Sequence, residues 1–167
     1  MTKKTPRRII EANRILISLG LPRAQQNERS ALCLLALLNL TPRKKWSRAE
    51  NPLMGITPIM DWVREHYQRE YAPNTRETFR RQTMHQFVDA GIALYNPDAP
   101  DRAVNSPKSV YQIEPATLEL LRRFGTSAWH DGLTDYLACR ETLAAKYAME
   151  RDQSRIPVQI AKGKRIT

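Results

Sequence analysis

One segment of the chain, residues 74–90, constrains the fold most, because both of its ends and its periodicity indicate a single helix. Asn74 is a good N-cap residue, and Glu77 three positions later fits a capping box. Gly91 is the residue type that commonly follows the end of a helix. Apolar or small residues recur at steps of four, four and three along one face: Phe79, Thr83, Phe87 and Ala90. We therefore predict an amphipathic helix with one buried face.

The opposite face of this helix carries side chains that can read base edges in a major groove. They are Asn74, Thr78, Arg81, Gln82 and His85. Arg can donate two hydrogen bonds to guanine, Gln can pair with adenine, and Thr can contact the methyl group of thymine. An ordinary solvated helix face has the same polarity, so the helix alone does not decide between the two interpretations.

The neighbouring segments predict a winged helix-turn-helix. Thr57-Pro58 indicates the start of an amphipathic helix that ends near Tyr71, and two short helices joined by a tight break form a helix-turn-helix. Residues 92–95 and 109–113 are predicted strands of a β-hairpin, joined by a polar, Pro-rich connection. The fold class is thus mainly α with a small wing. The tip of the wing would place four polar side chains on a phosphate backbone: Arg102, Asn105, Ser106 and Lys108.

Further helices are predicted on both sides of this unit. One runs from Pro6 to Gly20, and Asn27 caps another over residues 28–40 that is apolar all round, as expected for a central core helix. After the wing, Glu114-Pro115 starts a helix that ends at Gly125, and a long helix follows to about residue 151. We expect a basic helical extension over 1–26, a winged helix-turn-helix domain over 27–125 and a C-terminal helix over 126–155. Residues 156–167 are expected to begin a link to a further, missing domain.

The charge of the chain favours a polyanionic partner. Formal net charge is +10, which points to nucleic acid ahead of an anionic membrane. Residues 1–50 hold 11 Lys and Arg against 3 Asp and Glu, whereas residues 51–91 hold 5 of each. Part of the surplus lies in a predicted loop over residues 41–55, where Trp46 could anchor a clamp on the phosphate backbone. A solvated loop is the equal alternative. The basic residues of the clamp would be Arg43, Lys44 and Lys45.

Cysteine usage and hydropathy predict a soluble, cytoplasmic protein. Cys33 and Cys139 have no metal-ligand neighbour at a short spacing, and two isolated thiols favour a reducing compartment. Cys33 is expected to be an inert core residue. The longest apolar run, residues 31–38, is too short to cross a bilayer, and the N-terminus lacks a secretory signal.

No catalytic or metal-binding constellation is expected in this chain. The three His are scattered, and there is no phosphate-binding Gly loop among 6 Gly. Pro97-Asp98 matches the first half of the metal site of nucleases that use Pro-Asp followed by acid-x-Lys. However, no Lys has an Asp or Glu two positions before it, so Pro97-Asp98 is interpreted as a turn.

The chain resembles a known family over most of its length. Residues 71–87 are similar to the helix-turn-helix segment of the BsuBI/PstI type II restriction endonucleases, and the similarity continues through Gly91-Ile92, residues 95–98 and 105–107 to Tyr111. Residues 146–147, 156–158 and 163–164 resemble the link into the second domain of that family.

The resemblance implies a DNA-binding N-terminal domain that precedes a Mg²⁺-dependent PD-(D/E)xK catalytic domain. Such enzymes cleave double-stranded DNA at a short palindrome as homodimers. Because this chain lacks the second half, the resemblance carries over recognition and not cleavage, and Mg²⁺ would belong to the full-length enzyme.

The expected DNA contacts follow from the helical pattern. Arg76 and Arg80 are candidates for phosphate contacts. Candidates for recognition are Asn74, Thr75, Thr78, Arg81, Gln82 and His85. Two other functions fit the same pattern, a stand-alone winged-helix transcriptional regulator and a domain that binds protein. An acid-x-Lys motif downstream of residue 167 would support the nuclease, and a stop codon would support the regulator.

Overall fold

The computed structural model describes residues 6–103 and 106–139. Several expectations lie outside these residues: the first five residues of the basic extension, Asn105 at the tip of the wing, the second half of the long C-terminal helix and the link over residues 156–167. The described part is mainly helical and carries one small antiparallel sheet.

Helix α2 (Glu28–Leu37) forms the centre of the molecule. Its N-cap is Asn27, whose Oδ1 accepts a hydrogen bond from the backbone N–H of Ser30 at 2.8 Å. All eight residues from 31 to 38 are fully buried, as the all-round apolar pattern predicted. The helix ends at Leu37 and not at residue 40, because Asn39 adopts a left-handed conformation with φ 48°. Burial raises the pKa of the Cys33 thiol, so this cysteine is the inert core residue that was expected.

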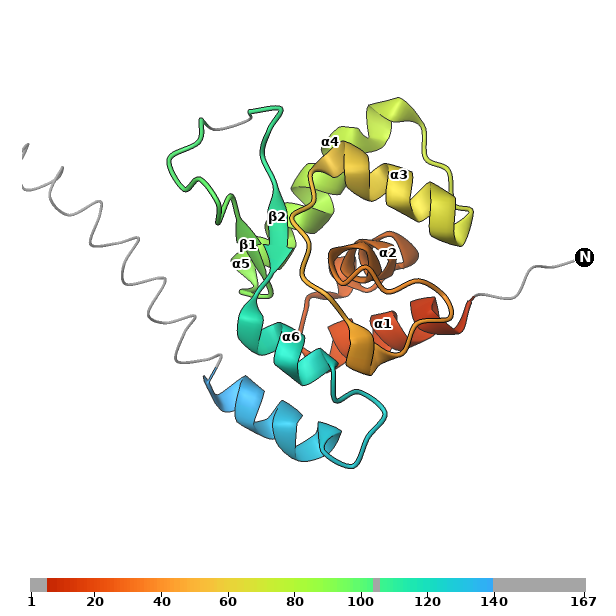
Figure 1. The fold of residues 1–167 in the computed structure, drawn as a ribbon, viewed down its shortest axis with the longest axis vertical. Coiled ribbons are helices and arrows are strands. Elements are labelled where there is room, and N and C mark those ends of the chain that lie inside the picture. The colour runs from red at the N-terminus through yellow and green to blue at the C-terminus, as the bar shows by residue number, and fades with distance from the viewer. Residues whose placement is uncertain (1–5, 104–105, 140–167) are drawn as a thin grey trace, which may run out of the picture.

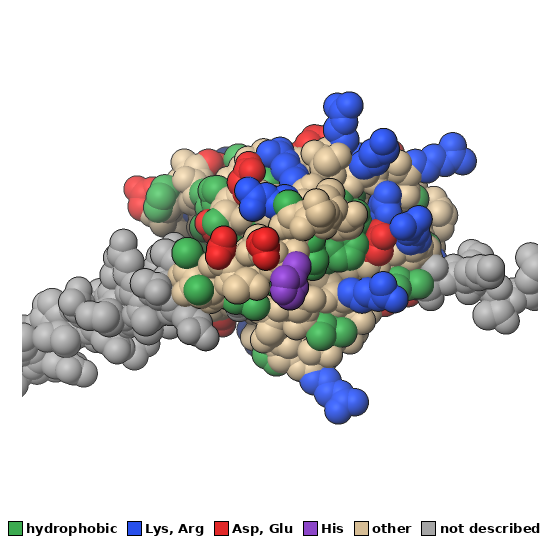
Figure 2. Space-filling model, turned by 90° about the horizontal axis from the view of Figure 1, so that it is seen from below, with side chains coloured by type: hydrophobic (Ala, Val, Ile, Leu, Met, Phe, Trp, Pro, Cys, Tyr) green, Lys and Arg blue, Asp and Glu red, His purple; other side chains and the backbone are tan. Residues whose placement is uncertain are grey.

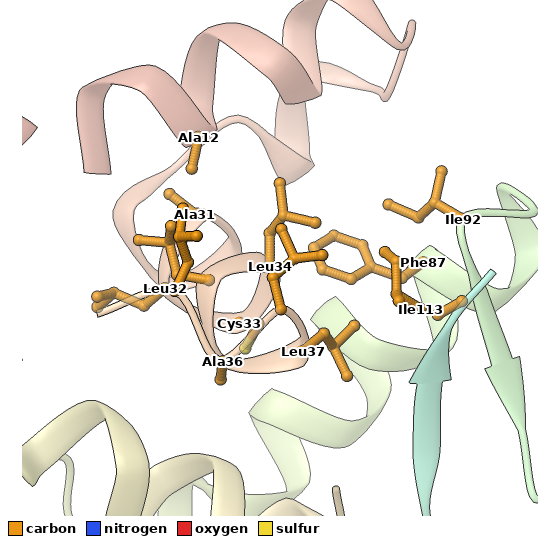
Figure 3. Packing of buried hydrophobic residues seen from close by; sticks show 14 of the residues in the cluster. Ala12, Ala31, Leu32, Cys33, Leu34, Ala36, Leu37, Phe87, Ile92 and Ile113 are labelled. Carbon is orange, nitrogen blue, oxygen red and sulfur yellow. The ribbon is translucent and has the colours of Figure 1, made fainter. Parts of the chain in front are cut away.

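Two layers of helix cover α2. Helix α1 (Arg7–Ser18) packs on one side, and α3 (Ile56–Tyr67) lies on the other (Figure 1). In the core, Ala12 of α1 faces Ala31, while Leu34 and Leu37 point toward Phe87 (Figure 3). Helix α2 therefore joins α1 to the helix-turn-helix in one core.

Helix α3 differs from its prediction at both ends. It begins at Ile56 after Gly55, so Pro58 occupies the third helical position, where its missing N–H has no partner within the helix in any case. It ends at Tyr67 because Gln68 takes a left-handed conformation with φ 53°. The connection to the next helix is consequently longer than the three residues that the sequence suggested.

The helix predicted over residues 74–90 is present but is not regular. A 3-10 turn, η3 (Pro73–Thr75), leads into α4 (Arg76–Phe79), which continues through a π-helical turn, η4 (Arg80–Met84), into α5 (His85–Asp89). We call α4, η4 and α5 together the composite helix. It ends at Asp89, and Gly91 two residues later has a φ of 80°, the left-handed conformation predicted for the residue after the helix.

The π-helical turn enlarges the buried face of the composite helix. Phe79 and Met84 are both fully buried although they are five residues apart, as the i to i+5 bonding of a π-turn allows. Thr83 is buried as well, and its Oγ1 accepts a hydrogen bond from Arg29 Nε of α2 at 2.9 Å. The prediction of a uniform helix was wrong here, and it left Met84 out of the core.

The predicted capping box is also absent. Asn74 lies inside η3, and within the described residues no side chain caps the start of η3 or α4. Glu77 pairs with Arg80 and Arg81 instead of reaching back to the N-cap. The guanidinium groups of Arg80 and Arg81, one turn later, bind the Glu77 carboxylate more strongly than the neutral backbone N–H of a capping box would.

The wing is a short hairpin of β1 (Ala93–Tyr95) and β2 (Tyr111–Ile113), in which Ala93 lies opposite Ile113 and Tyr95 opposite Tyr111. Residue 54 extends it on the other side of β2. The N–H of Met54 donates to the Tyr111 carbonyl and the N–H of Tyr111 donates to the Met54 carbonyl, both at 2.9 Å. The segment that we predicted as a loop over residues 41–55 therefore anchors the wing, and it also contains a 3-10 turn, η2 (Trp46–Arg48).

Helix α6 (Pro115–Leu121) and the helical residues 129–139 close the core from below in Figure 1. Glu114 caps α6 by accepting hydrogen bonds from the N–H groups of Ala116 and Thr117. Trp46 is buried, which favours the anchored loop over the solvated alternative: its ring lies 5.3 Å from that of Phe124, and its Nε1 donates to Glu11 of α1 at 2.9 Å. Across the described residues, no helix has the length and apolar character needed to cross a membrane.

The two candidate caps provide a test of these assignments. Replacing Asn27 by Ala should lower the free energy of unfolding by about 0.5–2 kcal/mol, because the first turn of α2 loses its side-chain acceptor. Replacing Asn74 by Ala should change it by less than about 0.5 kcal/mol, as is usual for an exposed site without such a bond. Urea denaturation followed by circular dichroism measures both, and equal losses would contradict the structure.

Candidate nucleic-acid interface

A hollow of about 650 Å³ opens between the start of α3, the start of the composite helix and the wing. Five side chains proposed from the sequence line it: Asn74, Arg76, Arg80, Ser106 and Lys108. They come from two separate segments of the chain, and the packing of the wing against the helix-turn-helix brings them together. The other residues that line the hollow are Gly55, Ile56, Thr57, Pro58, Pro73, Glu77, Tyr95, Pro107, Ser109, Val110 and Tyr111.

Glu77 binds two arginines on the composite helix. Its Oε1 accepts from Nε of Arg80 and its Oε2 accepts from Nη2 of the same guanidinium, both at 2.8 Å. Nε of Arg81 lies 2.9 Å from Oε2. The hydrogen bonds and positive charge of Arg80, assisted by Arg81, lower the pKa of Glu77, so the carboxylate stays ionised at neutral pH.

The predicted front of the composite helix is largely accessible. Asn74, Arg76, Arg81 and Gln82 are exposed, and 74% of the Arg81 side chain is accessible to solvent. Thr78 is half-buried, as is Thr75, whose hydroxyl donates to the carbonyl of Ala72. The front is therefore available to a ligand, and its centre is the pair Arg81 and Gln82.

His85 connects the composite helix to the wing and is only half-buried. Its Nε2 and the hydroxyl of Tyr111 share a hydrogen bond at 3.3 Å, and its ring lies 5.4 Å from the Tyr95 ring. Burial, followed by the positive charge of Arg80, lowers the pKa of His85. This histidine is neutral at physiological pH and takes part in an aromatic contact that positions the wing.

The wing presents less positive charge than the sequence suggested. Arg102 donates to Asn96 Oδ1 at 2.9 Å and pairs with Asp98 at 3.0 Å, and only 18% of its side chain is exposed. Its guanidinium therefore stabilises the turn after β1. Pro97 and Asp98 lie in this turn, as expected from the sequence. Ser106 is half-buried and its Oγ accepts from the N–H of Lys108, whereas the side chain of Lys108 is exposed.

The basic part of the predicted loop lies apart from the hollow. Arg43 and Lys45 are exposed, but Lys44 forms an ion pair with Glu50 and donates to the carbonyl of Asn39 at 3.1 Å. Trp46 holds this loop on α1, and none of the loop's basic residues lines the hollow. On the face shown in Figure 2, most of the Lys and Arg side chains lie toward the right. The exposed residues Arg43 and Lys45, which we call the basic side, are thus separate from the hollow.

Three contributors to the site were missed from the sequence. Glu77 was assigned to a cap, although Arg at both the third and the fourth position after it signals ion pairs on one helix face. Tyr95 and Tyr111 were assigned only to strands. Their rings lie 5.2 Å apart beside His85, and no spacing in the sequence indicates that contact.

The residues present do not fit a metal site. Over 6–103 and 106–139, no group of three or more His, Cys, Asp or Glu side chains comes together as metal ligands. The Mg²⁺ implied by the resemblance has no donor set in this part of the chain.

The helical core, the composite helix and the hairpin define a winged helix-turn-helix. Comparison with known proteins gives the family: the model of the BsuBI/PstI restriction endonuclease HTH domain matches residues 6–145, so the chain belongs to this family.

Two curated relatives and one solved structure agree with this. The chain is 62% identical over 166 residues to the type II restriction enzyme BsuBI of Bacillus subtilis, covering 99% of this chain and 52% of that protein. It is 39% identical over 153 residues to the type II restriction enzyme AplI of Arthrospira platensis, covering 92% and 47%. The structure of SdaI restriction endonuclease matches with a TM-score of 0.75 and 34% identity, over 83% of this chain and 45% of that one. The chain thus spans about half the length of these relatives.

The lowered pKa of His85 predicts a pH dependence of stability. Between the ordinary value of 6.5 and the lower folded value, the unfolded chain binds more protons. The contribution of neutral His85 is therefore complete above about pH 6.5 and is lost as the pH falls through the folded pKa. Urea denaturation between pH 7 and pH 5 should show a steeper loss of stability for the natural chain than for His85→Gln. Parallel curves would contradict this role of His85.

Proposed function

We propose that this chain is the sequence-reading part of a type II restriction endonuclease and that the composite helix enters the major groove of double-stranded DNA. The observation that carries the proposal is the exposed polar front of that helix, beside a hollow edged by Arg76 and Lys108. Membership of a restriction endonuclease family supports it. In helix-turn-helix proteins, residues near the start of the second helix contact base edges.

The side chains divide between two kinds of contact. Arg81 and Gln82 have the exposure and the donor pattern for guanine and adenine, respectively. Asn74, Arg76 and Lys108 surround the hollow and suit the phosphate backbone that runs along the groove. Arg43 and Lys45, on the separate basic side, would attract DNA without reading its sequence.

The activity of the whole enzyme is proposed from the relatives. By their names the relatives are type II restriction enzymes, and this chain spans about half of their length. The other half would hold the Mg²⁺-dependent nuclease, which hydrolyses both strands at a short palindrome, and a homodimer would match the symmetry of such a site. The two cysteines, which have no metal-ligand neighbour at a short spacing, favour a reducing cytoplasm as the compartment.

Base reading is tested by replacing Arg81 and Gln82 separately with Ala. Each change should reduce discrimination by about 1–3 kcal/mol, because it removes a pair of hydrogen bonds to one base, while weak non-specific binding remains. The preferred duplex is first selected from a library with a random core, and fluorescence anisotropy then compares it with a scrambled duplex. Unchanged discrimination in both variants would rule out the composite helix as the reading element.

The charges of the basic loop should affect the affinity for all duplexes, unlike Arg81 and Gln82, which should affect discrimination between them. Neutralising Arg43 and Lys45 should weaken binding to the selected and scrambled duplexes equally, and the salt dependence of log K should flatten by about 0.9 for each phosphate that the protein no longer neutralises. Lys44→Ala is the matched control, since its ammonium group already pairs with Glu50. Salt titrations measure the slopes, and a selective loss on one duplex would count against a purely electrostatic role.

A further inference from the structure

An acidic residue occupies the part of the composite helix that the proposed function brings closest to DNA. Between residues 71 and 91 the acids are Glu77 and Asp89. Glu77 lies in the first turn and lines the hollow, among the residues proposed to contact phosphates. A carboxylate there repels the DNA backbone and lowers the affinity for every duplex. Its place in the interface therefore calls for a function that offsets this cost.

Stabilising the fold accounts for the pairing of Glu77 with Arg80, whose side chain is 22% exposed, but not for the contact that Glu77 makes with Arg81. The Glu77 side chain is 58% exposed and that of Arg81 is 74% exposed. Ion pairs between such exposed groups on one helix contribute little to stability. The contacts instead constrain two arginines, because one carboxylate binds Arg80 through two hydrogen bonds at 2.8 Å and approaches Nε of Arg81 at 2.9 Å.

The edge of Arg81 that Glu77 holds is compatible with base reading. The carboxylate contacts Arg81 at Nε, on the side of the guanidinium nearest the chain. Guanine O6 and N7 can accept hydrogen bonds from the outer part of a guanidinium, so an arginine held at Nε can still read guanine. An exposed arginine without such a partner has to be ordered when DNA binds, and that ordering reduces affinity.

We propose that Glu77 is a specificity-determining residue that positions Arg81 for a base edge. Its carboxylate fixes the direction of the Arg81 side chain before DNA binds, so that the matching base meets an arginine that is already ordered. Its charge weakens binding to every duplex alike, and only a duplex with the matching base gains the contact that offsets this loss. This inference rests on the proposed function, because it requires that the composite helix reads DNA.

The experiment uses the 167-residue chain and a duplex library with a random central core of about eight base pairs. The natural chain should select a consensus, and anisotropy then gives the ratio of affinities for the consensus and a scrambled duplex. Glu77→Gln should lower this ratio about 3- to 10-fold, the factor expected for ordering one long side chain. Affinity for the scrambled duplex should stay the same or rise. Asp89→Asn removes an equal charge from the other end of the composite helix and should leave the ratio unchanged.

A double-mutant cycle tests whether Glu77 acts through Arg81. In the Arg81→Ala background, Glu77→Gln should cause no further loss of discrimination, because the arginine that it positions is absent. Additive losses would show that Glu77 contacts the DNA independently, and they would overturn the positioning role. Glu77→Asp keeps the charge but shortens the side chain, so it should also lose discrimination. If circular dichroism shows that the Gln variant is unfolded, the Asp variant provides the same test.

The outcomes separate the two proposals. In one outcome, the natural chain selects a consensus and Glu77→Gln has the same ratio of affinities for the consensus and the scrambled duplex. That result overturns the role of Glu77 and leaves the proposed function standing. A rise in affinity for both duplexes by the same factor also overturns it, because that result reports charge repulsion alone. Failure of the natural chain to select any consensus overturns the proposed function, and the role of Glu77 with it.

Discussion

The packing of α2 against the back of the composite helix is the interaction on which the rest of the structure depends. Leu34 and Leu37 of α2 lie toward Phe87, and all three side chains are fully buried (Figure 3). Burying a leucine or a phenylalanine contributes about 1.5–3 kcal/mol each, so this contact fixes the rotation of the composite helix about its own axis. The rotation in turn decides which side chains face solvent. Arg81 and Gln82 are available to a ligand because Phe79, Met84 and Phe87 are not.

The polar contact between Arg29 and Thr83 shows how this core also shapes the exposed front. Thr83 lies in the π-helical turn and accepts a hydrogen bond from Arg29, which projects from α2. A π-turn inserts an extra residue into the helical repeat, so the residues before and after it are shifted relative to a regular helix. The front of α4, with Arg76 and Glu77, is thereby set at a different angle from that of α5. The wing is fixed to the same unit by the Met54 backbone pairs and by the contact of Tyr111 with His85.

Charged side chains of the described residues form two separate regions. The basic loop is held on α1 by Trp46 and by Arg8, whose Nε donates to the carbonyl of Lys44 at 2.9 Å, while the composite helix and the wing enclose the hollow elsewhere. Several cations that count toward the net charge are already paired inside the protein, among them Arg80, Arg102 and Lys44. A strong net charge therefore indicates a polyanionic partner, but it does not identify the cations that meet it.

The sequence by itself determined the order and type of the main elements, the capped start of α2 at Asn27 and the left-handed Gly91 that follows the composite helix. These features depend on local periodicity and on residues with narrow backbone preferences, which act over a few positions. It also determined which face of the composite helix is buried, apart from Met84. Only the tertiary structure decided the π-turn, the pairing of Met54 with Tyr111 and the inward direction of Arg102. Each of these depends on a partner distant in the chain or on competition among several partners for one charged group, and no local pattern records the outcome.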